Sequence, residues 1–231
     1  MSPQPAISTV KPPVAPGSAG EQRLPLRARK KLRTRQALID TALRLFTEQG
    51  FDGTTLDELC DRVEVSKRTF FRTFTSKEDV AMAPTQDLWA AFLDDLETRD
   101  PAGGTLLEML RDALLAAIRA MTDEGWAERV LLSRRLAAVT PSMDAHGLHF
   151  CDRIMRTALA TLRRRLDLAD PADLRPRFAL DFLLAAFHQA LEGWIGQPGT
   201  PTRDQLADRV RTSIAALPGA LTLTADLRRD G

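Results

Sequence analysis

Apolar residues recur every three or four positions along most of the chain, with polar residues between them. In residues 29–49, for example, Leu38, Ile39, Leu45 and Phe46 form one apolar stripe, which is the period of an amphipathic α-helix. No stretch alternates apolar and polar residues over several positions as a half-buried strand does. The pattern therefore predicts an all-α protein.

Capping residues divide this pattern into separate helices. Gly50 follows the first helix at a position where a left-handed residue commonly ends one. Thr55 and Glu58 form a capping box that opens a short second helix. Ser66 then caps a third helix, which we expect over about residues 67–73.

The rest of the chain predicts a connecting helix and a helical body. The connecting helix is expected from Ser76 to about Glu97, with Pro84 as a kink. Five more helices are predicted at 105–122, 125–139, 142–166, 173–194 and 202–217, with Pro218 and Gly219 as the last break. We therefore expect four regions: a disordered N-terminal arm (1–28), a three-helix head (29–80), a larger helical body (81–217) and a tail (218–231).

The formal net charge of +1 is a cancellation between two parts of the chain. Residues 1–81 hold 14 Lys and Arg against 10 Asp and Glu, a net of +4, and residues 82–231 hold 18 against 21, a net of −3. Between Arg23 and Arg35 there are seven basic residues and no acid. A basic arm before a folded segment is typical of nucleic-acid binding, and a solvated charged leader explains the same run equally well.

Composition excludes several classes of protein. No apolar run reaches the roughly 18–20 residues that span a bilayer, and residues 1–20 lack the apolar region of a signal peptide. Two cysteines, Cys60 and Cys151, are too few for a disulfide scaffold, which favours a cytoplasmic location. Because no Gly-rich phosphate loop or Gly-x-Ser-x-Gly sequence is present, we expect neither an enzyme nor a cofactor.

The second and third predicted helices, joined by a tight turn, form a helix-turn-helix pattern. In such a unit the second helix enters the major groove of B-DNA, and its first residues contact base edges. Phe70 and Phe74 lie four residues apart and should pack inward, which leaves the cationic and hydroxyl side chains around them facing outward. A plain helical hairpin with a cationic face is the competing interpretation.

This unit resembles the TetR family of bacterial transcriptional regulators. The family pattern has a Gly-aromatic pair, a Gly-x-Thr-Thr turn and a Val-Ser-x-x-Thr start to the recognition helix. Residues 50–55 read GFDGTT and residues 65–78 read VSKRTFFRTFTSKE, so the similarity covers about residues 32–82. The variant RTFFR followed by SKED resembles an actinobacterial subgroup that includes regulators of mycofactocin-type redox systems.

The resemblance implies a regulator that binds a palindromic double-stranded DNA operator as a homodimer, most often as a repressor. It implies base contacts from the start of the third helix and phosphate contacts from Thr55 and Lys77. With the basic arm included, the residues expected to contact DNA are Arg29, Lys30, Arg33, Thr55, Ser66, Lys67, Arg68, Thr69, Phe71, Arg72, Thr73 and Lys77.

Three positions depart from the family pattern. Glu64 stands in the turn where the family often has Gly, which should strain the backbone. Phe71 replaces a phosphate-binding Tyr and has no hydroxyl, and Thr73 replaces a second Tyr or His with a shorter side chain. We therefore expect the basic arm to supply more of the phosphate contacts.

The resemblance also implies that the last two long helices form a four-helix bundle with a partner subunit. Ordinary core packing explains their apolar stripes equally well. The residues expected at the dimer interface are Leu180, Leu184, Phe187, Leu191, Leu206, Val210 and Ile214.

A small-molecule effector pocket is expected in the body, and the ligand is expected to be mainly hydrophobic, or an acyl thioester if the subgroup resemblance holds. Each aromatic or Met candidate is alternatively a core residue. The candidates are Trp89, Phe92, Leu110, Leu114, Trp126, Met143, Phe150, Met155 and Phe187, with Arg134, His146, His149 and Gln189 as polar anchors.

A metal site is not expected. His146 and His149 are spaced to share a metal, but Cys151 points to a different face of the same predicted helix. Two other functions stay open at this point: a DNA-binding architectural protein without a ligand, and a helical carrier of acyl or lipid groups whose head does not bind DNA.

Overall fold

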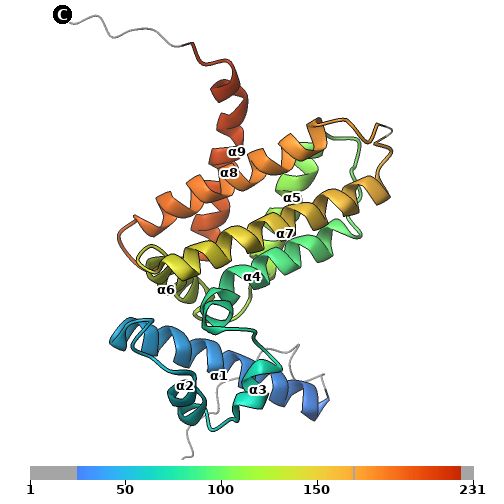
Figure 1. Ribbon diagram of the computed structural model, residues 1–231. Coiled ribbons are helices and arrows are strands. Elements are labelled where there is room, and N and C mark those ends of the chain that lie inside the picture. The colour runs from blue at the N-terminus through green and yellow to red at the C-terminus, as the bar shows by residue number, and fades with distance from the viewer. Residues whose placement is uncertain (1–24, 169, 225–231) are drawn as a thin grey trace, which may run out of the picture.

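The computed structural model describes residues 25–168 and 170–224, and every regular element in this part of the chain is an α-helix (Figure 1). The all-α prediction is confirmed. The expected disorder of the arm falls mainly on residues 1–24, which lie outside the described residues. The helices are α1 (Leu26–Gln49), α2 (Leu56–Arg62), α3 (Lys67–Phe71), α4 (Lys77–Leu96), α5 (Leu106–Ala120), α6 (Trp126–Ala137), α7 (Pro141–Arg165), α8 (Arg175–Ile195) and α9 (Arg203–Leu221).

Helices α1, α2 and α3 pack around an apolar core at one end of the molecule (Figure 1). Leu38, Phe46, Leu59 and Phe70 are almost fully buried there. Gly50 adopts a φ of +84°, which lets the chain turn sharply after α1. These contacts form the three-helix head.

Helix α4 connects the head to the body. Its N-terminus is fixed by Ser76, whose hydroxyl accepts a hydrogen bond from the backbone N–H of Asp79 at 3.2 Å. Val80 and Ala83 belong to the head core, whereas Trp89 belongs to the body core. A movement of α4 would therefore displace side chains in both the head core and the body core.

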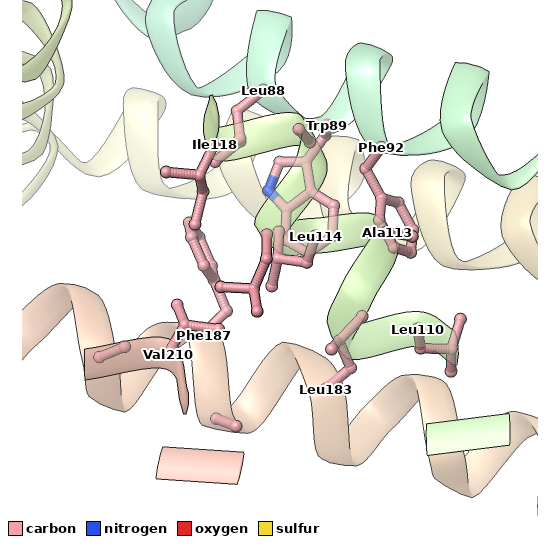
Figure 2. Close-up of a cluster of buried hydrophobic side chains, with 14 of the residues drawn as sticks. Leu88, Trp89, Phe92, Leu110, Ala113, Leu114, Ile118, Leu183, Phe187 and Val210 are labelled. Atoms are coloured by element: carbon pink, nitrogen blue, oxygen red, sulfur yellow. The ribbon is translucent and has the colours of Figure 1, made fainter. Parts of the chain in front are cut away.

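The body core lies where α4, α5, α8 and α9 meet, and α7 packs against α4 and α8. Figure 2 shows Trp89 and Phe92 of α4 beside Leu114 of α5 and Phe187 of α8. The Trp89 ring meets the Phe187 ring edge-on, with centroids 5.1 Å apart. Helix α8 packs most extensively against α9, whose last turns extend beyond the other body helices (Figure 1).

Several predicted helix boundaries differ from the observed ones by two to four residues. Helix α1 begins at Leu26 rather than residue 29, so part of the expected arm is helical. Helix α3 ends at Phe71 rather than near residue 73. Helix α9 continues through Pro218 to Leu221, because a proline this close to the C-terminus removes only one hydrogen bond of the last turns.

Candidate nucleic-acid interface and body pocket

Helix α3 presents a cationic face because Phe70, together with Phe74 just after the helix, packs into the head core. Phe70 is fully buried and Phe74 is 3% exposed, and their ring centroids lie 5.8 Å apart. The predicted inward packing of these two residues is confirmed. Arg68 and Arg72 are exposed on the other side of the helix, where their guanidinium groups can reach base edges or phosphates.

The turn before α3 is strained at the position expected from the sequence. Glu64 has a φ of +56°, in the left-handed region that disfavours residues with a Cβ. The turn is closed by the N–H of Val65, which donates to the carbonyl of Cys60 at 3.0 Å. Ser66 then caps α3 by accepting a hydrogen bond from the N–H of Thr69 at 3.2 Å.

A groove of about 640 Å³ lies between the start of α1 and α3. Helix α1 contributes Arg27, Lys30 and Lys31 to its walls, and α3 is followed by Arg72 on the opposite wall. Among the residues that the structure describes, no Asp or Glu lines this groove. The two basic segments seen in the sequence are therefore brought together on one surface, which suits a polyanion.

The remaining cations and hydroxyls of the expected DNA-binding set differ in accessibility. Lys30 and Arg33 are exposed on α1, whereas Arg29 is half-buried. Thr55 is exposed and caps α2 by accepting from the N–H of Glu58 at 3.1 Å. The Thr73 hydroxyl donates to the carbonyl of Thr69 at 3.2 Å. These hydroxyl groups therefore also stabilise the helix ends.

Two further residues of that set are Lys67, which has a partner within the head, and Phe71, which has an exposed ring. Lys67 forms an ion pair with Asp57 of α2, with 2.7 Å between its Nζ and the Asp57 Oδ1, and this hydrogen bond raises the pKa of Lys67. Phe71 is 53% exposed. It therefore presents an apolar ring at the position where the family pattern has a phosphate-binding tyrosine.

Lys77 corrects an expectation. Its Nζ donates to the carbonyls of Phe51 and Thr54 at 2.6 and 2.8 Å, and it lies 4.5 Å from the centroid of the Phe51 ring. The ammonium is therefore hydrogen-bonded to the turn between α1 and α2. Lys77 ties α4 to the head, and this geometry does not support the expected phosphate contact.

The body contains a pocket of about 220 Å³ between α4, α6, α7 and α8. Four of the nine apolar candidates line it: Trp89, Met143, Phe150 and Phe187. The other five are corrected to core positions, because their helices turn them toward the packed interior instead: Phe92, Leu110, Leu114, Trp126 and Met155.

Polar groups of the pocket come from all four of these helices. Arg134 of α6, a predicted anchor, lines the pocket, whereas the other predicted anchors His146, His149 and Gln189 do not. His188 of α8 also lines the pocket. It was not among the predicted anchors, because no local pattern distinguishes it from a core residue. Burial, reinforced by the positive charge of Arg134, lowers the pKa of His188, so its imidazole is neutral at physiological pH.

The expected dimer-interface residues are used inside the subunit. Six of the seven are buried within the chain's own core, at no more than 6% exposure, and Leu184 alone is half-buried. The apolar stripes of α8 and α9 face each other and α5, which corrects the expectation. Leu174 at the N-cap of α8 and Phe178 on α8 are 63% and 51% exposed, and the Phe178 ring stacks on the Phe182 ring with centroids 6.4 Å apart.

Within residues 25–168 and 170–224, no group of three or more His, Cys, Asp and Glu side chains is arranged to hold a metal ion. His146 instead lies 3.3 Å from the amide nitrogen of Gln86 and 3.9 Å from Asp79. None of the helices described is both long and apolar enough to cross a bilayer.

A helix-turn-helix head on a helical body defines the class of helix-turn-helix DNA-binding regulators. Residues 38–83 match the family model described as bacterial regulatory proteins of the tetR family. The chain is 37% identical over 214 residues to the HTH-type transcriptional regulator TcmR of Streptomyces glaucescens. This match covers 89% of this chain and 91% of TcmR. The chain belongs to the TetR family of transcriptional regulators.

Two further comparisons agree with this assignment. The chain is 24% identical over 172 residues to MftR of Mycobacterium tuberculosis, named as a mycofactocin biosynthesis transcriptional regulator, covering 72% of this chain and 82% of MftR. The fold resembles that of Thermus thermophilus FadR, a TetR family repressor solved with lauroyl-CoA, with a TM-score of 0.50, 21% identity and coverage of 85% and 99%. The protein is a transcriptional regulator rather than an enzyme.

Proposed function

We propose that the protein is a ligand-responsive repressor that binds a palindromic operator as a homodimer and is released by a small, mainly hydrophobic effector. The observation that carries this proposal is the position of α4. Met82 and Gln86 of α4 line the body pocket, while Val80 and Ala83, within the same turns, are buried in the head core. A ligand that displaces these turns would therefore move the head.

Operator binding is assigned to the groove between α1 and α3. Arg68 and Arg72 would contact bases, because α3 is the second helix of the helix-turn-helix unit, the one that enters the major groove, and Lys30 and Lys31 on α1 would contact phosphates. We propose that the two heads of a dimer lie about 34 Å apart, which is the spacing of successive major grooves. Because bacterial chromosomal DNA lies in the cytoplasm, the protein would act there.

Dimerisation is assigned to the outer faces of α8 and α9. Apolar side chains are exposed at the N-cap of α8 (Leu174), on α8 (Phe178) and at the end of α9 (Leu221). Exposed apolar patches mark association sites. The variant F178E would place a charge in that interface. We expect it to sediment as a monomer, whereas F178L should remain a dimer.

Effector release requires that the ligand bind one spacing of the heads better than the other. A gel shift with the DNA upstream of the protein's own gene tests both parts of the proposal. Binding of this DNA excludes an acyl or lipid carrier. Its release by lauroyl-CoA or by naphthalene-2-carboxylate supports a sensor, and retention of the DNA at saturation of the pocket would instead indicate an architectural protein.

A further inference from the structure

Arg134 is a cation in the body pocket that has no anionic partner. Its Nε is buried and makes no hydrogen bond, and no carboxylate of the described residues forms an ion pair with it. Thr85, on the wall formed by α4, likewise has a buried hydroxyl without a hydrogen-bond partner. Buried polar groups are nearly always satisfied, so the two groups point to a missing acceptor.

The acids of the same pocket are placed differently. Asp144 and Glu192 line it, but both are exposed, and Glu192 accepts a hydrogen bond from the amide of Gln189 at 3.2 Å. They are solvated at the rim. Arg134 is less exposed than either acid. Its charge acts on both His188 and Cys151, whereas that of Glu192 acts on His188 as a smaller, opposing influence.

The neighbouring titratable groups do not compensate Arg134. Burial raises the pKa of Cys151, so this side chain is a neutral thiol at physiological pH. His188 is a neutral imidazole for the reason given above. The inner part of the pocket therefore carries one unbalanced positive charge.

The remaining inner wall is apolar and largely aromatic. Trp89, Phe150 and Phe187 line it together with Met143 and Leu191. The edge-to-face contact between Trp89 and Phe187 keeps both rings in fixed orientations. Such a wall favours a flat ring system over a flexible polar molecule.

We propose that the effector is an aromatic molecule bearing an anionic oxygen group, a carboxylate or a phenolate, and that Arg134 binds this group while the rings rest against Trp89 and Phe187. The proposal rests on the proposed function for the existence of an effector. It adds the chemical class of the ligand and the residue that selects it. A guanidinium matches a carboxylate by two parallel hydrogen bonds.

Three probes with the same ring system test the charge preference: naphthalene-2-carboxylate, the neutral naphthalene-2-carboxamide and the cationic 2-naphthylmethylammonium. Dissociation constants are measured by calorimetry on the full-length protein. We expect the carboxylate to bind about tenfold or more tightly than the amide, which is the range for a hydrogen bond to a charged group. Equal binding, tighter binding of the cation or no binding of any probe would overturn the proposal.

The variant R134Q tests the residue assignment. It should weaken binding of the carboxylate by about tenfold or more and abolish its preference over the amide, and R134K should restore part of the preference. The matched control is R135Q, which removes the adjacent, exposed guanidinium of the same helix and should leave all three constants unchanged. A carboxylate preference that persists in R134Q would show that another group binds the anion.

The two proposals fail in distinguishable ways. If the carboxylate binds through Arg134 but does not release DNA, the ligand class stands and the sensor function fails. If DNA is released by the amide as readily as by the carboxylate, the sensor function stands and the anionic class fails. The gel shift and the calorimetry are therefore carried out on the same protein preparations.

Discussion

Lys30 and Lys31 offer the sharpest test of the groove between α1 and α3. Both are exposed on α1 and line the groove. The double variant K30A/K31A removes both cations while keeping the helix, because alanine has the highest helix propensity. It therefore separates the electrostatic contribution from the folding of the head.

The magnitude follows from counterion release. Each phosphate neutralised contributes about 0.9 to the slope of log K against log salt concentration. Loss of two contacts per subunit should make that slope less steep by about 1.8 per subunit, or about 3.6 for a dimer. For a slope change of about 1.8, a fourfold increase in salt concentration should weaken binding of the variant about tenfold less than it weakens binding of the wild type.

The assay is fluorescence anisotropy with a labelled fragment from upstream of the gene, titrated over a series of salt concentrations. The control variant R156A/R163A removes two exposed cations from α7 in the body and should leave the slope unchanged. If K30A/K31A keeps the wild-type slope, the groove does not contact phosphates and the assignment of the DNA-binding surface is refuted.

Three further predictions concern individual residues. K77M should lower the free energy of unfolding by about 2 kcal/mol, since two charged hydrogen bonds in a half-buried site are lost, but should leave the salt slope unchanged; a reduced slope with unchanged urea stability would identify a phosphate contact instead. E64G should raise the melting temperature by relieving a left-handed strain of about 1 kcal/mol, partly offset by the flexibility of glycine, and E64V should lower it; the opposite order would exclude strain. Because the pKa of His188 is lowered in the folded state, the unfolded chain binds more protons and stability falls as pH drops below about 6.5; H188Q should reduce this fall in urea titrations at several pH values, and an unaltered pH dependence would contradict the assignment.

The head could be predicted well from the sequence because its signals are local. Ser66 as a cap, Phe70 as a core residue and Glu64 as a strained turn residue all follow from spacing within a few residues. The role of Lys77 could not be predicted in the same way. Its ammonium contacts carbonyls 23 and 26 residues earlier in the chain, and only the packing of α4 on the head brings them together.

The packing of the body could be predicted from the sequence only in part. Helical periodicity identifies the apolar side of α8 and α9, but it does not tell a subunit core from a dimer interface, so Leu180 and Val210 were assigned to the wrong surface. The pocket was found in part for a related reason. Trp89 and Phe92 lie on the same helix, and only the arrangement of α7 and α8 decides that Trp89 borders an open space.

Operator binding by a dimer is tested most directly by sequencing the genomic DNA fragments that the purified protein retains. We expect enrichment of an inverted repeat whose half-sites lie about one helical turn, or a multiple of it, apart. We also expect loss of that enrichment with R68A/R72A, which removes the exposed arginine of α3 and the one directly after it. Operator binding through these arginines would be contradicted if the wild-type protein enriched no sequence, or if the variant enriched the same sequence as the wild type.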